Sequence, residues 1–159
     1  MNVPTSIERN KELSRRLYIE VFGAGNVDAA DEIMAADCIS HGPGAPPALG
    51  TDGIKLQSAL LRAAIPDLTV ALEAQIAEGD RVASHWLGRG SFTGQFRLPG
   101  LALPPTGAPI SFNEIRIDRV LDGRIVESWF IPDRLTLWQQ LGLFPPQSSA
   151  TSRDLDGQR

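Results

Sequence analysis

The sequence is poor in the residues on which disulfides and metal sites depend. It contains one cysteine, Cys38, and two histidines, His41 and His85, which stand 44 positions apart. A single cysteine cannot form an intramolecular disulfide, and these histidines with scattered acidic residues do not make a recognisable metal-binding set. No glycine-rich motif follows a strand and opens a helix, so nucleotide binding has no support. We therefore expect neither a metal nor a cofactor.

Basic stretches and long apolar runs are also absent. The chain has 15 Lys and Arg residues against 19 Asp and Glu residues, a formal net charge of −4. This balance argues against nucleic acid or an anionic membrane as a partner. The first residues lack the apolar stretch of a signal peptide. We expect a cytoplasmic protein that binds a small molecule or another protein.

The periodicity of apolar residues changes along the chain from helical to extended. Its 159 residues, 42% apolar and 21% charged, are typical of one soluble domain with a single core. Spacings of three and four residues, as in Leu13, Leu17 and Val21, predict helices over about residues 6–22, 27–35 and 52–65. Alternation predicts strands over about 68–76, 81–93, 110–120 and 125–131, and a short helix follows over 134–141. The order indicates the α+β class, with one domain over 1–144 and a polar, disordered tail over 145–159.

The dipeptide Asp122-Gly123 is a strong signal for a two-residue type I′ turn between the last two strands. In that register Arg116 opposes Trp129, and opposed residues share a face of the sheet. One face then combines charged and aromatic side chains, as a solvated cavity requires, although an exposed ion network is the alternative. The other face is aliphatic, and we expect it to be covered by other elements or a second subunit. The first face comprises Phe112, Glu114, Arg116, Asp118, Glu127, Trp129 and Asp133, and the second comprises Ile115, Ile117, Val126 and Phe130.

Several segments, in a fixed order over about residues 10–142, together resemble one known family. They are the helix ending in Phe22-Gly23-Ala24-Gly25-Asn26-Val27-Asp28-Ala29, then Ser40-His41-Gly42-Pro43, Pro66-Asp67-Leu68, Glu78-Gly79-Asp80-Arg81-Val82-Ala83 with Trp86, Pro105-Thr106-Gly107, and Arg119-Val120-Leu121-Asp122-Gly123-Arg124-Ile125-Val126-Glu127-Ser128-Trp129. With them the chain resembles the SnoaL-like polyketide cyclase family of the nuclear transport factor 2-like superfamily.

The resemblance implies a conical cavity between a curved antiparallel sheet and the helices, commonly in a homodimer. Cyclases of the family use an aspartate after the last-strand Trp as general acid/base, without metal or cofactor, and Asp133 matches it. Many members also have a histidine at the position of His41. Epoxide hydrolases of the superfamily place an Arg-x-Asp pair and a further Asp where this chain has Trp86, Gly88 and Ile131, so their triad is absent.

Asp133 and His41 are the catalytic residues that we expect. A carboxylate held near an aromatic and partly dehydrated has a raised pKa, which suits it to take a proton from carbon next to a carbonyl. His41 would orient Asp133, relay a proton or hydrogen-bond a substrate carbonyl. The alternatives are a helix cap for Asp133 and a contact with local backbone for His41. We expect substrate contacts from Tyr18, Trp86, Phe112, Glu114, Arg116 and Trp129.

These expectations point to a cofactor-independent acid/base enzyme that acts on a hydrophobic carbonyl substrate. The resemblance implies an antibiotic-biosynthesis cyclase, a lyase or isomerase that closes a ring by intramolecular aldol condensation. A non-catalytic domain that binds a small apolar molecule is the alternative, as is a partner in an oxygenation step, because the fold alone does not decide function.

Overall fold

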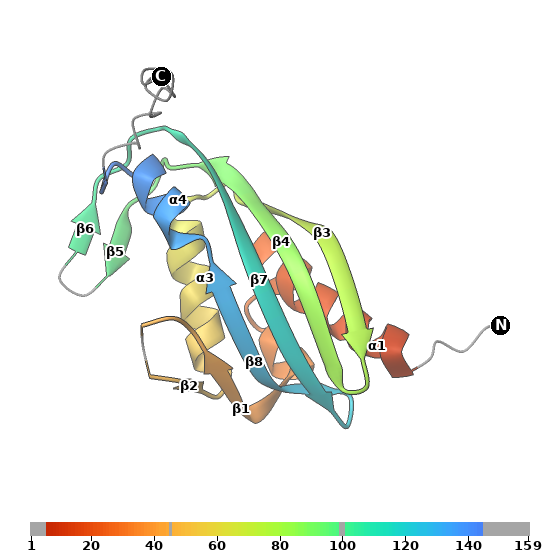
Figure 1. Cartoon of the computed structure of the whole chain (residues 1–159). Coiled ribbons are helices and arrows are strands. Elements are labelled where there is room, and N and C mark those ends of the chain that lie inside the picture. Colours follow the sequence, from red (N-terminus) through yellow and green to blue (C-terminus); the bar gives the residue numbers. More distant parts are fainter. Residues whose placement is uncertain (1–5, 45, 99–100, 145–159) are drawn as a thin grey trace, which may run out of the picture.

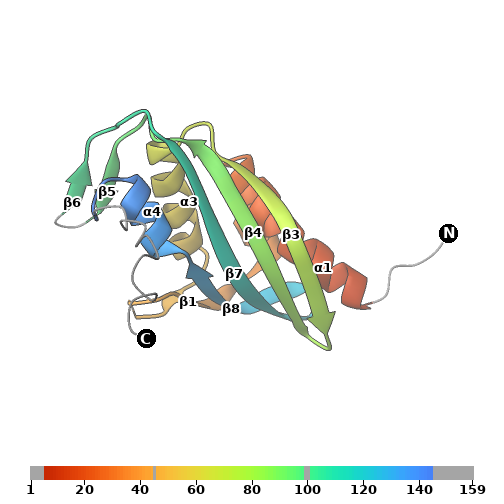
Figure 2. The ribbon, with the colours of Figure 1, turned by 45° about the horizontal axis from the view of Figure 1, so that its top comes forward.

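One large sheet with helices against one of its faces forms the structure, a computed structural model that describes residues 6–44, 46–98 and 101–144. Figures 1 and 2 show α1 (Ser6–Arg16) and α3 (Asp52–Ala64) lying along the same face of this sheet. The chain continues from α1 into a π-helical segment, η1 (Leu17–Gly23), and then into a short helix, α2 (Ala29–Ile33). The last helix is α4 (Arg134–Gln140). No helix in the described part of the chain is long and apolar enough to cross a membrane.

Six strands make up the large sheet, in the order β2-β1-β8-β7-β4-β3. All neighbours are antiparallel except β1 and β8, which run parallel. A separate two-stranded sheet, β5 (Phe96–Leu98) with β6 (Leu101–Leu103), lies beyond the end of β4. The strands of the large sheet are β1 (Met34–His41), β2 (Ala48–Leu49), β3 (Thr69–Glu78), β4 (Arg81–Ser91), β7 (Pro109–Leu121) and β8 (Arg124–Pro132).

The predicted α+β class is confirmed, and four of the strands of the sheet lie close to where alternation places them. The strand β1 was not predicted, because the helical spacing before it continues to Met34 and the following Ala35 and Ala36 carry little strand signal. The helix expected over 27–35 therefore ends at Ile33. The strands β5 and β6 lie between the strands predicted over 81–93 and 110–120, where no strand is predicted. The predicted tail, residues 145–159, lies outside the described residues.

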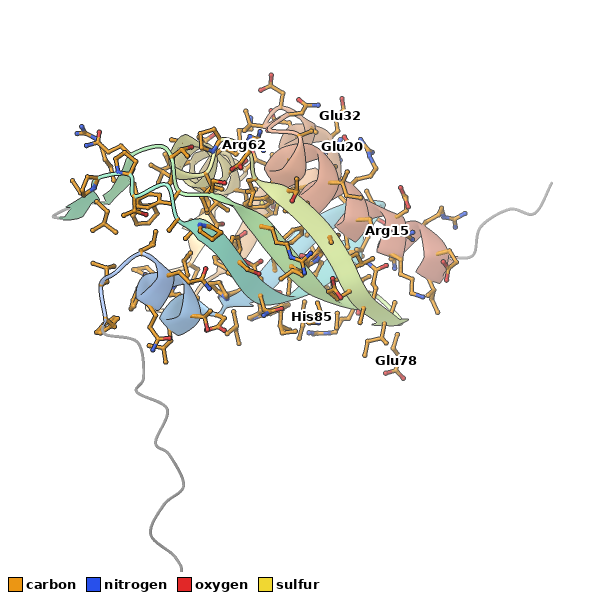
Figure 3. The ribbon with its side chains drawn as sticks, turned by 90° about the horizontal axis from the view of Figure 1, so that it is seen from above. Arg15, Glu20, Glu32, Arg62, Glu78 and His85 are labelled. Carbon is orange, nitrogen blue, oxygen red and sulfur yellow. The ribbon has the colours of Figure 1, made fainter. Side chains whose placement is uncertain are left out.

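The two faces of the large sheet differ in burial. Even-numbered residues of β4 and β7, such as Trp86 and Arg116, are buried on what we call the inner face, beneath the helices. Odd-numbered residues, such as His85 and Ile115, lie on the outer face, and Figure 3 shows His85 pointing away from α1 and α3. The alternation follows from the two-residue period of a strand.

The register predicted for the last hairpin is wrong beyond its first two pairs. Val120 pairs with Ile125 as expected, but Arg119 pairs with Glu127, so Val126 is an extra residue in a β-bulge. Every later residue of β8 is therefore on the opposite face from the one predicted, and Trp129 pairs with Ile117 instead of Arg116. Without the bulge, Glu127 would lie on the same buried face as Glu114 and Asp118, and three acids would be held close together.

Candidate functional site

A narrow cavity lies between the helices and the inner face of the sheet. Its volume is about 20 Å³, room for a group about the size of a water molecule. Its walls are mostly apolar and aromatic, and Glu114 is the one charged side chain among the described residues that line it. The lining residues are Tyr18 and Phe22 from η1, Gln57 and Leu61 from α3, Val70 from β3, Trp86 and Gly88 from β4, and Phe112 and Glu114 from β7.

The π-helical segment η1 supplies the wall opposite the sheet. Tyr18 and Phe22 stand four residues apart on it with ring centroids 5.1 Å apart, and the Tyr18 ring stacks on Trp86 at 4.2 Å. Helix ends leave carbonyl groups without partners. Here Nη1 of Arg62, on α3, donates to the carbonyls of Phe22 (3.1 Å) and Gly23 (2.7 Å) and so ties η1 to α3. Arg62 is labelled on the helical side of the molecule in Figure 3. π-helical turns are rare and are frequently found at functional sites.

Gly88 and Phe112 are paired across β4 and β7 and form one end of the cavity wall. A Cβ atom at position 88 would collide with the Phe112 ring. The absence of a side chain at Gly88 therefore lets the ring lie over the β4 backbone, where it faces the cavity.

Glu114 supplies the carboxyl group of the cavity, and its pKa is strongly raised. Its residue is 8% exposed, and no hydrogen bond to the carboxylate comes from any described residue. Burial raises its pKa from the usual 4.5 to about 7, because the anion loses its hydration. The Arg116 guanidinium lowers this pKa, and the Asp118 carboxylate raises it. Burial has the largest effect, so both protonation states of Glu114 are accessible near neutral pH.

A fully paired polar network lies next to Glu114. Nε of Arg116 donates to Oδ1 of Asp118 at 2.7 Å, and Nη2 of Arg116 donates to Oγ of Ser128 at 2.8 Å. Oγ of Ser128 and Oγ of Ser14 each donate to Asp118, both at 2.6 Å. Because Asp118 balances the charge of Arg116, the guanidinium only partly offsets the effect of burial on Glu114.

Three members of this network were missed or misjudged from the sequence. An exposed ion network was the alternative for the charged face, but Asp118 on that face is completely buried. In the predicted register Ser128 would pair with Ile117 on the outer face, whereas the bulge pairs it with Asp118 on the inner face. Ser14 occupies a buried position of α1 beside the apolar stripe, and a lone serine at such a position is a signal for a buried polar partner.

Asp133, the expected acid/base, lies outside the residues that line the cavity. It is the N-cap of α4, and its Oδ1 accepts a hydrogen bond from the backbone N–H of Thr136 at 3.1 Å. Hydrogen bonding to Thr136, through its side chain first and its backbone N–H second, lowers the pKa of Asp133. The expectation of a pKa raised by dehydration is therefore wrong at this residue, and the alternative of a helix cap describes the observed contact.

His41 and Trp129 lie together on the outer face. Their rings stack with centroids 5.2 Å apart, and Arg81 lies 5.4 Å from the centre of the Trp129 ring. The His41 Nε2 atom is 2.9 Å from Oε1 of Glu127, and Nε of Arg119 donates to Oε2 of the same carboxylate at 3.2 Å. The expectation that Trp129 shares a cavity with Trp86 is therefore wrong, since the bulge at Val126 turns it outward.

Of the residues expected to contact substrate, Tyr18, Trp86, Phe112 and Glu114 do line one cavity. A wider hollow of about 800 Å³ lies elsewhere, beside Asp31, Asp52 and Arg124, but every residue that lines it is exposed or half-exposed. Over residues 6–44, 46–98 and 101–144, no three His, Cys, Asp or Glu side chains gather in a way that could hold a metal ion.

Comparison with known proteins agrees with this architecture. The model of the SnoaL-like polyketide cyclase family matches residues 12–141. The chain belongs to this family. A comparison with curated proteins gives no match.

Solved structures of several SnoaL-like proteins are similar to this one. IdmH, a proposed polyketide cyclase from Streptomyces antibioticus, is 32% identical with a TM-score of 0.70, over 84% of this chain and 98% of that chain. A proposed polyketide cyclase from Acidithiobacillus ferrooxidans is 29% identical with a TM-score of 0.71, over 90% of this chain and 99% of that one. AclR from Streptomyces galilaeus, a proposed hydroxylase, is 23% identical with a TM-score of 0.78, over 91% and 87% of the two chains, and shows the fold alone.

Proposed function

We infer that this SnoaL-like protein is a general acid/base enzyme in which Glu114 moves a proton to and from a hydrophobic carbonyl compound. The observation that carries this inference is a buried carboxyl group with a pKa of about 7 beside an aromatic cavity. A general base works best when its pKa lies near the working pH, because it is then both ionised and basic enough. Of the two carboxyl groups considered, Asp133 has a lowered pKa and is held by a helix cap, so Glu114 is better suited.

The reaction would begin at a carbon next to the carbonyl group. The Glu114 carboxylate takes a proton from this carbon, and the C–H electron pair becomes the C=C bond of an enolate, whose oxygen takes the negative charge. The enolate carbon then either regains a proton from Glu114 or attacks a second carbonyl carbon of the same molecule, which closes a ring. In the second case the new alkoxide takes the proton from Glu114. Ring closure of this kind is the aldol condensation implied by the family resemblance.

Proton exchange tests the proposal without knowledge of the natural substrate. The apolar ring ketone 2-tetralone is incubated with the protein in D₂O, and loss of its proton signal next to the carbonyl is followed by NMR. The wild-type protein should accelerate exchange, with a rate that rises with pH through about 7 as Glu114 ionises. Glu114→Gln should lose at least the ~10²-fold typical of a general base, and Asp133→Asn, the matched control, should retain exchange.

Two other outcomes would each reject the assignment. If Asp133→Asn abolishes exchange and Glu114→Gln does not, proton transfer belongs to Asp133. If the wild-type protein binds 2-tetralone but does not accelerate exchange, the cavity is a binding site without acid/base catalysis.

A homodimer through the outer face is also part of the proposal. Ile115, Ile117 and Ile131 are 48%, 37% and 68% exposed on adjacent positions of β7 and β8. An apolar patch in the middle of a sheet is rarely left open in a soluble protein. The patch differs from the one expected, because the bulge replaces Phe130 with Trp129 and Ile131 on this face.

A further inference from the structure

Two hydrogen-bond donors in the cavity wall have no partner among the residues that the structure describes. Oη of Tyr18 and Nε1 of Trp86 are both buried, and no described residue accepts a hydrogen bond from either. The residues themselves are 5% and 1% exposed, and both line the cavity. Burying a donor without an acceptor destabilises a folded protein, so such atoms are uncommon.

The polar side chains next to the cavity do have partners. Arg116 donates to Asp118 and Ser128, and Ser128 and Ser14 donate to Asp118. Two further buried atoms without a hydrogen bond, Oγ of Ser40 and Nε of Arg15, belong to residues outside the cavity lining, and Nε of Arg15 lies 3.5 Å from Oε2 of Glu12. The two unpaired donors in the cavity wall instead belong to one stacked pair of rings.

The chemistry of the two donors defines the atom that would satisfy them. An indole N–H can only donate, and a phenol hydroxyl can donate as well, so a ligand atom that pairs with either of them must be an acceptor. The cavity of about 20 Å³ has room for one small group, such as a carbonyl oxygen.

We propose that Tyr18 and Trp86 form the carbonyl-binding pair of this site, donating hydrogen bonds to the oxygen of a ring ketone and to the enolate formed from it. This inference rests on the proposed function, and it means that the carbonyl group is the part of the substrate that enters the cavity first. In this proposal the negative charge of the enolate would develop on an oxygen that accepts hydrogen bonds from both side chains, and donors held in place by the fold stabilise such a charge most effectively. Glu114, which lines the same cavity, would accept and return the proton.

The test compares two ligands that differ only in the carbonyl group. Binding of 2-tetralone and of tetralin, which has no oxygen, is measured for the wild-type protein, Tyr18→Phe and Trp86→Phe. Tyr18→Phe should bind 2-tetralone about three- to tenfold more weakly, the loss of one hydrogen bond, and tetralin unchanged. Trp86→Phe also removes part of a ring from the cavity wall, so it should weaken 2-tetralone binding more than tetralin binding. Trp138→Phe, on α4 and not among the lining residues, is the control and should bind both ligands as the wild-type protein does.

Infrared spectroscopy of ¹³C-carbonyl 2-tetralone gives a second readout that a purely structural role would not change. On binding to the wild-type protein the C=O stretch should move to lower frequency, and the shift should be smaller in Tyr18→Phe. Glu114→Gln should lose proton exchange but keep the full shift of the C=O stretch. This result would separate the role of Glu114 as the base from the role of Tyr18 and Trp86 in binding the carbonyl. Equal shifts in the wild-type protein and Tyr18→Phe would overturn the carbonyl-binding pair, and failure of both ligands to bind the wild-type protein would overturn both proposals.

Unfolding of the free protein closes the test. Because the Tyr18 hydroxyl has no acceptor in the described part of the chain, Tyr18→Phe should be as stable as the wild-type protein or more so. A marked loss of stability, or equal weakening of tetralin and 2-tetralone binding, would mean that the hydroxyl is structural, and would refute the proposal.

Discussion

Replacing Glu114 by Gln should make the protein more stable at high pH and leave it nearly unchanged in acid. The carboxyl has its usual pKa of 4.5 in the unfolded chain and about 7 in the folded protein. Between these values the unfolded chain is ionised while the folded protein still holds the proton. The folded state therefore binds more protons, and its stability falls as pH rises from about 4.5 to about 7.

The size of the effect follows from the difference between these two pKa values. Each pKa unit corresponds to about 1.4 kcal/mol, so ionising Glu114 above pH 7 costs the folded state about 3 kcal/mol. Gln has nearly the shape of the protonated acid but cannot ionise. Relative to the difference at pH 4, Glu114→Gln should thus gain about 3 kcal/mol over the wild-type protein by pH 8.5.

Urea denaturation at several pH values between 4 and 8.5 measures this gain. Glu127→Gln is a control with the opposite sign, because the hydrogen bond with His41 lowers the pKa of Glu127. That variant should lose stability at neutral pH, and the loss should shrink in acid as the wild-type carboxylate is protonated. A difference between Glu114→Gln and the wild-type protein that stays constant across the pH range would refute the raised pKa and, with it, the choice of Glu114 as the base.

Three further changes test other parts of the structure. Asp133→Ala should lower the free energy of unfolding by about 1 kcal/mol, and Asp133→Asn by less, because Asn also caps helices; chemical denaturation measures both. Asp118→Asn should lower the pKa of Glu114, since Arg116 would then act without an opposing carboxylate, and a carboxyl titration followed by ¹³C NMR that shows no fall would contradict this. Ile117→Lys should convert a wild-type dimer to a monomer in sedimentation, while Leu56→Lys on α3 should not, and a monomeric wild-type protein at micromolar concentration would refute the outer-face interface.

Alternation along β7 was enough to place Phe112, Glu114 and Arg116 on one face, because a strand without irregularities keeps its period of two. The same counting gave the wrong face on β8, because a bulge has no sequence signal as clear as the Asp122-Gly123 dipeptide of the turn. The bulge keeps Glu127 off the face that buries Glu114 and Asp118, but this arrangement can be seen only in the folded sheet. The helix predicted over 134–141 begins where α4 does and made a cap at Asp133 one of the alternatives, but the effect on the pKa depends on hydrogen bonds to Thr136 that only the folded structure shows. The stacking of Tyr18 on Trp86 joins segments 68 positions apart and needed the three-dimensional structure.

The extra residue at Val126 also affects how assignments pass between relatives. A protein without this insertion would have the same aligned letters around the last-strand tryptophan but would present each of them to the other side of the sheet. Deleting Val126 should, by the same logic, exchange the two faces of β8 and turn Trp129 toward the helices. Within this family, equivalent residues of the last strand are therefore best identified by the residue that each pairs with on the neighbouring strand. A functional role assigned by counting residues from the tryptophan holds only between chains that share the bulge.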